Sequence, residues 1–137
     1  MTGVQTCALP IWYGVALDAF TGDAIPVHLL TTEAFQLYWR HLKPDGILAV
    51  HISNHYLDLE PVVVNLANQF KYQIAAIDHD EGEDDAWDYS STWILLSHNE
   101  KIITSPAIST AAYAIKTNSV RFPLWTDDFT SVYQILK

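Results

Sequence analysis

Polar residues follow two apolar runs of the chain, and their types could support proton chemistry. Asp18 and Asp23 come after the run of residues 13–17, and His51 and Asn54 lie at the end of the run of residues 47–52. Carboxylates and imidazoles are the groups with which proteins hold cations and exchange protons near neutral pH. If both runs are neighbouring strands, these residues share one rim of a sheet. Alternatively, Asp18 has a purely structural role and caps the loop after its strand.

His51 has two further interpretations. It lies four positions before His55, but at a junction of strand and loop this spacing does not align the two rings, so we predict no metal site. The default role of His51 is a hydrogen-bonded histidine in the core or at the rim, and a role in a cleft, shared with Asn54, is the alternative.

Two groups of acids remain open to more than one interpretation. Asp127 and Asp128 stand just before residues 130–136, which are predicted to form a short terminal helix, so one of them could be its N-cap rather than a ligand-binding residue. The acidic segment 78–88 is predicted to be a solvated loop, with an acidic lid that guides cationic amines as the alternative.

The elements that position these residues alternate along the chain. Residues 13–18 form a continuous apolar run that ends in an acid, which predicts a strand buried on both faces. Helical periodicity covers residues 32–42 and is stopped by the sequence Lys43-Pro44-Asp45-Gly46. The run of residues 47–52 then predicts a second buried strand. This is one β-α-β unit.

The alternation continues in the second half. Asp58 is the predicted cap of a helix with Pro61 in its first turn, and a third strand is expected over residues 72–77. Residues 92–97 predict a fourth, antiparallel strand, and residues 106–116 a helix. The predicted fold class is therefore α/β, with a Rossmann-like, mostly parallel sheet that has one antiparallel strand. In that architecture ligands bind outside the carboxyl ends of the strands.

Composition excludes several classes of partner. The net charge is −9 with only seven Lys and Arg residues, so we expect neither nucleic acid nor a membrane surface as a partner. Cationic partners are compatible with this charge. The single cysteine, Cys7, gives no disulfide framework and no zinc cluster.

Three segments carry a family resemblance: LDAFTGDAIPVHLLTTE (residues 17–33), LKPDGILAVHISN (residues 42–54) and PLWTDDF (residues 123–129). They resemble spermidine synthase-like domains, in particular bacterial versions fused behind transporter-like membrane segments. The resemblance implies the C-terminal half of a class I methyltransferase/spermidine synthase fold. It also implies transfer of an aminopropyl group from decarboxylated S-adenosylmethionine to a polyamine such as putrescine, in the cytoplasm, by a parent that upstream segments could anchor at the inner membrane.

The resemblance also assigns roles to residues. Asp18 matches the catalytic acid of the family, and Asp23, His51, Asn54, Asp127 and Asp128 are the expected substrate-binding residues. One departure concerns spacing, because Asp18 and Asp23 stand five positions apart whereas the two acids of true synthases are closer together. Two alternatives therefore stay open. These are a methyltransferase that uses S-adenosylmethionine and a silent domain that senses a polyamine or nucleoside for an attached transporter-like part.

The glycines indicate that a part of the domain is missing. They stand at positions 3, 14, 22, 46 and 82 and form no glycine-rich loop after a strand, which is the element that holds the nucleotide in this class. We expect that loop upstream, so the chain alone should bind no S-adenosyl nucleotide and have no transferase activity. Its first strand should then be an unprotected edge, which predicts a homodimer or aggregation.

The first eleven residues stand apart from this pattern. They fit neither strand nor helix periodicity and resemble the translation of a common sequencing adapter, so we expect the natural domain to cover residues 12–137.

Overall fold

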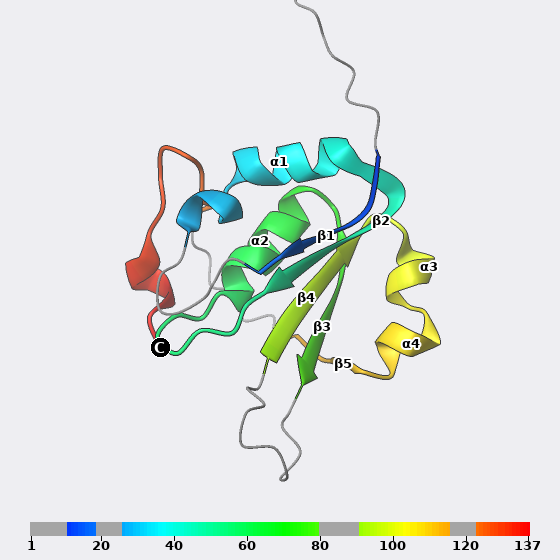
Figure 1. Ribbon diagram of the computed structural model, residues 1–137. Coiled ribbons are helices and arrows are strands. Elements are labelled where there is room, and N and C mark those ends of the chain that lie inside the picture. Colours follow the sequence, from blue (N-terminus) through cyan, green and yellow to red (C-terminus); the bar gives the residue numbers. More distant parts are fainter. Residues whose placement is uncertain (1–10, 19–25, 80–90, 116–122) are drawn as a thin grey trace, which may run out of the picture.

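A five-stranded sheet forms the centre of the fold. The computed structural model describes residues 11–18, 26–79, 91–115 and 123–137. The strands lie in the order β1-β2-β4-β3-β5 (Figure 1). Their bounds are β1 Trp12–Leu17, β2 Leu42–His51, β3 Gln73–His79, β4 Ser91–Ser97 and β5 Ala112–Tyr113.

The strand directions correct the prediction of a mostly parallel sheet. Only β1 and β2 pair in parallel, and β2–β4, β4–β3 and β3–β5 are antiparallel pairs. The reason is the position of β4. Strands β2 and β3 run in the same direction, but β4 lies between them and runs the opposite way, so their parallel pairing is lost. The antiparallel direction predicted for residues 92–97 is confirmed.

Two ten-residue helices follow the first two strands. Helix α1 spans Thr32–His41, and the Thr31 side chain accepts a hydrogen bond from the backbone N–H of Ala34 at 3.2 Å. Helix α2 spans Glu60–Gln69 with Pro61 in its first turn, as predicted. Its N-cap is Leu59 rather than Asp58, although the Asp58 carboxylate accepts a hydrogen bond from the Glu60 N–H at 3.3 Å.

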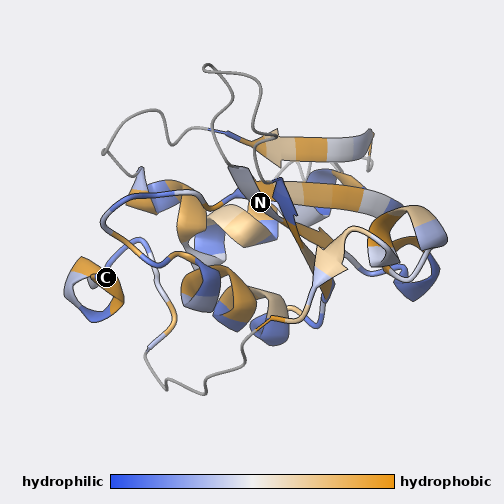
Figure 2. Cartoon of the chain, turned by 90° about the horizontal axis from the view of Figure 1, so that it is seen from below, coloured by the Kyte–Doolittle hydropathy of each residue, from blue (hydrophilic) through white to orange (hydrophobic). Residues whose placement is uncertain are grey.

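One face of the sheet and both helices enclose the core. Leu48 and Val50 of β2 stand opposite Leu96 and Ile94 of β4, and all four side chains are fully buried. The same cluster contains Phe35 of α1 and Val63, Leu66 and Ala67 of α2. Figure 2 shows hydrophobic residues along the strands and along parts of the helices. Burying each large apolar side chain stabilises the fold by about 1.5–3 kcal/mol before entropy is counted.

Strand β1 differs from its prediction as a strand buried on both faces. It lies at an edge of the sheet among the described residues, and of its six residues only Leu17 is buried. Tyr13 is 70% exposed and Trp12 is 40% exposed. The predicted association of copies through this edge stays a prediction.

The last third of the chain also differs from its prediction. Where one helix over residues 106–116 was predicted, the structure has the four-residue helix α4, Pro106–Ser109, followed by β5. Another four-residue helix, α3 Glu100–Ile103, precedes them. The terminal element is the 3-10 helix η2, Val132–Ile135, rather than a helix over residues 130–136. An earlier 3-10 helix, η1, covers Val27–Leu30. Pro106 and Pro123 limit how far a helix can extend in this region, and the apolar runs between them are short. A long helix is therefore not formed.

Gly46 is expected to tolerate no side chain. A Cβ at this position would lie 2.9 Å from Leu42 Cδ2, 3.0 Å from the Lys43 carbonyl oxygen and 3.2 Å from the Trp12 carbonyl oxygen. Two of these atoms are backbone, so Gly46→Ala should lower the free energy of unfolding by about 1–3 kcal/mol in urea titrations. The matched control is Gly14→Ala, where the nearest atom is 3.5 Å away, and its expected change is below about 0.5 kcal/mol. Equal losses in both variants would contradict this account of Gly46.

Candidate functional site

The carboxyl ends of β1 and β2 bring two predicted residues together. Asp18 follows β1 directly and His51 is the last residue of β2. One carboxylate oxygen of Asp18, Oδ1, lies 2.9 Å from His51 Nδ1. The Asp18 side chain is 59% exposed and the His51 side chain is 18% exposed. The pair therefore joins an accessible carboxylate to a largely covered imidazole.

Trp93 of β4 completes this arrangement from the other side. It stands opposite His51 in the antiparallel pairing, and the two rings stack with centroids 4.8 Å apart at 25°. No signal in the sequence around Trp93 indicates this contact with His51. Three strands thus contribute one row, Asp18, His51 and Trp93, and the stacked indole restricts the imidazole ring.

The contact between Asp18 and His51 is electrostatic in character. Although Nδ1 and Oδ1 are close, neither ring nitrogen of His51 has a hydrogen-bond partner of acceptable geometry among the described residues. The distance satisfies an ion pair, whereas the direction of approach does not satisfy a hydrogen bond. The attraction therefore depends on whether the ring carries a proton.

Asn54 lies three positions after His51, and its side chain stabilises the following turn. Its side-chain oxygen accepts hydrogen bonds from the backbone N–H groups of Tyr56 and Leu57, both at 2.9 Å. The neighbouring Ser53 hydroxyl accepts a hydrogen bond from the Thr92 N–H at 2.7 Å. These contacts close the turn after β2 and tie it to β4. The predicted role of Asn54 in substrate binding stays a prediction.

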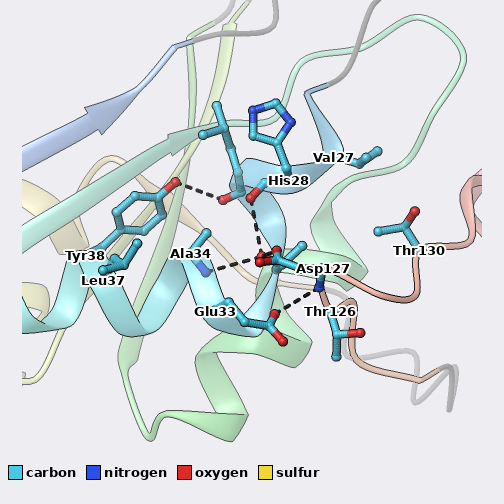
Figure 3. A pocket seen from close by; sticks show the side chains of 11 residues that line it. Val27, His28, Glu33, Ala34, Leu37, Tyr38, Thr126, Asp127 and Thr130 are labelled. Carbon is cyan, nitrogen blue, oxygen red and sulfur yellow. Dashed lines mark hydrogen bonds between the residues drawn. The ribbon is translucent and has the colours of Figure 1, made fainter.

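Asp127 lies in a second place, at the first turn of α1. The Thr31 hydroxyl donates to Asp127 Oδ1 at 2.8 Å, and Glu33 Oε2 accepts a hydrogen bond from the Asp127 backbone N–H at 3.0 Å (Figure 3). Asp128 is exposed in the same turn. Neither acid caps the terminal element, because Ser131 holds the N-cap position of η2. The turn instead attaches the C-terminal segment to α1.

A pocket of about 420 Å³ adjoins this attachment. Apolar side chains of η1 and α1, including Val27, Leu37 and Tyr38, form part of its wall, and Glu33 and Asp127 lie at the turn side (Figure 3). A hydrogen bond from the backbone N–H of Glu33 itself is the largest cause that lowers the pKa of its carboxyl, and the Thr32 hydroxyl adds to it. Glu33 is therefore a charged acid at the positive end of the α1 dipole, where it stabilises the helix.

The predicted site residues consequently fall into two groups. Asp18 and His51 contact each other, Asp127 contacts Thr31, and among the described residues no hydrogen bond or ion pair joins the two pairs. Asp23 lies outside the described residues, as does most of the acidic segment 78–88. Neither Asp18 nor His51 lines the pocket beside α1, and we favour the pair as the candidate site because a carboxylate and an imidazole can exchange protons.

The glycines of the described residues lie within strands. Gly14 lies within β1 and Gly46 within β2, so neither glycine opens a loop that could cradle phosphate or ribose. In the same ranges no three His, Cys, Asp or Glu side chains gather as metal ligands. Asp18 and His51 are of the residue types with which proteins bind cations and exchange protons.

Neither models of known protein families nor the sequences of curated proteins match this chain. Every helix in the described ranges is too short or too polar to cross a membrane.

Proposed function

We propose that this chain is the amine-binding part of a spermidine synthase-like transferase. The observation that carries the proposal is the Asp18 carboxylate, which is 59% exposed at the carboxyl end of β1 and lies 2.9 Å from His51. The nucleotide-binding half would be supplied by a further segment, with decarboxylated S-adenosylmethionine as co-substrate. The cytoplasmic location and the polyamine acceptor belong to the same proposal.

Asp18 suits the demands of an amine nucleophile. An alkyl ammonium has a pKa near 10 in water, so it must be held and then lose a proton before it can attack carbon. A carboxylate attracts the ammonium, orients it, and stabilises the positive charge that develops on nitrogen. The exposure of Asp18 leaves room for such a ligand, and the net charge of −9 favours cationic ligands.

The strand arrangement gives further support. β1, β2 and β3 run in one direction and β4 runs the opposite way, so the sheet has three strands whose carboxyl ends meet at one rim. Ligands of α/β sheets bind at such a rim. This supports the methyltransferase-like half-fold implied by residues 17–33 and 42–54.

A binding role without turnover is the second candidate. It is favoured by the glycines, because those described lie inside strands and offer no nucleotide loop. In this case Asp18 would hold a polyamine, and the domain would report its concentration to an attached protein.

The test is a transfer assay with two donors. A protein in which this chain follows the nucleotide-binding half is mixed with putrescine and either decarboxylated S-adenosylmethionine or S-adenosylmethionine, and products are identified by mass spectrometry. The proposal predicts an aminopropylated amine from the decarboxylated donor only. Methylated product would establish methyl transfer instead, and amine binding without product from either donor would establish the sensing role.

A further inference from the structure

His51 and an amine ligand would compete for the same carboxylate. His51 Nδ1 lies 2.9 Å from Asp18 Oδ1, which is the group that we assign to the ammonium. An imidazolium is itself a cation of the kind that a carboxylate binds. When the ring is neutral, Asp18 keeps its full charge for another cation.

The surroundings of the ring keep it in this position. The stacked indole of Trp93, with centroids 4.8 Å apart, holds one side of the imidazole, and the strand pairing fixes both residues at adjacent places in the sheet. Among the described residues, Asp18, which follows β1, is the charged group paired with the ring, and β4 presents the uncharged Trp93. The His51 ring is therefore less free to rotate than the ring of an exposed histidine.

We propose that His51 is a built-in, proton-dependent competitor for the amine site. In its protonated form it neutralises Asp18 and weakens amine binding, and in its neutral form it leaves Asp18 to the ammonium. Binding of an amine therefore displaces a proton from the ring. This inference rests on the proposed amine site at Asp18, but it requires no transfer chemistry.

The sign and size of the effect follow from linkage. A ligand that excludes the protonated ring binds more weakly as the pH falls through the titration range of imidazole. Complete exclusion of a protonated imidazole weakens affinity about tenfold between about pH 8 and about pH 5.5, the range that brackets the titration of imidazoles in general.

The experiment measures the affinity of the 137-residue chain for putrescine by calorimetry at both pH values. The wild type should bind about tenfold more weakly at the lower pH. His51→Phe preserves an aromatic ring against Trp93 but has no ionisable nitrogen, so its affinity should be the same at both pH values. His55→Phe, at an exposed histidine four positions on, should keep the tenfold change.

Three results would overturn the inference: equal affinity of the wild type at both pH values, an unchanged pH dependence in His51→Phe, or no putrescine binding at either pH. The proposed transferase function fails on different grounds. If putrescine binds with the expected pH dependence and no donor yields product, the inference stands and the transferase function is wrong.

Discussion

Replacing Trp125 by alanine is expected to lower the free energy of unfolding by about 3–5 kcal/mol, the cost typical of removing a large buried aromatic side chain. Trp125 is 1% exposed and is the largest fully buried side chain among the described residues. It belongs to the same core cluster as Phe35 and Leu66. Its carbonyl oxygen also accepts a hydrogen bond from the Thr32 N–H at 2.9 Å, so the residue joins the C-terminal segment to the start of α1.

The matched control for this change is Trp39→Ala. Trp39 lies on α1, is 51% exposed and contacts His98 edge to face. The same chemical change should cost clearly less there, because about half of the residue's surface remains in water. Urea unfolding followed by far-ultraviolet circular dichroism compares both variants with the wild type. A loss in Trp125→Ala no larger than that in Trp39→Ala would contradict the assigned core.

Removing the charge of Asp18 is expected to reduce amine transfer about a hundredfold in kcat/KM, at the lower end of the contribution of a positioned acid or base. Asp18→Asn keeps the size of the side chain but removes the negative charge that holds the ammonium. The assay is the two-donor transfer reaction with putrescine as acceptor. The loss should fall on kcat as well as KM, because the carboxylate also stabilises charge as it develops on nitrogen.

Asp45→Asn serves as the control for this charge change. Asp45 is an exposed acid near the start of β2, at the end of the strand opposite to His51. The Asp45→Asn variant loses the same charge as Asp18→Asn. Its kcat/KM should stay within about twofold of the wild type, because an exposed charge far from the reacting group is screened by salt. Equal losses in both variants would show that net charge, rather than Asp18, governs the rate.

The meeting of Asp18 and His51 could be predicted from the sequence because it depends on local signals. Two apolar runs flank a helix of ordinary length, which favours neighbouring parallel strands whose carboxyl ends share a rim. The contact with Trp93 could not be predicted, since it depends on the register of the antiparallel pair β2–β4, and α2 and β3 separate these two strands in the sequence. A shift of one residue in that register would turn Trp93 to the other face.

Long-range contacts explain the other differences. Thr31 and Asp127 are 96 positions apart, and nothing in the pattern around either residue indicates their hydrogen bond. The apolar composition of residues 12–17 suits both a central and an edge strand, so sequence alone gave no reason to place β1 at the edge. The position of a strand in the sheet depends on the segments that pack against it as well as on its own sequence.

The most direct test of the amine site is to map where putrescine binds on the chain by ¹H–¹⁵N correlation spectroscopy. The proposal predicts progressive shifts for the amides of Asp18, His51 and Trp93, and the loss of these shifts in Asp18→Asn. Shifts confined to Thr31, Glu33 and Asp127 would place the ligand in the α1 pocket instead. That result, or an unchanged pattern in Asp18→Asn, would contradict the account.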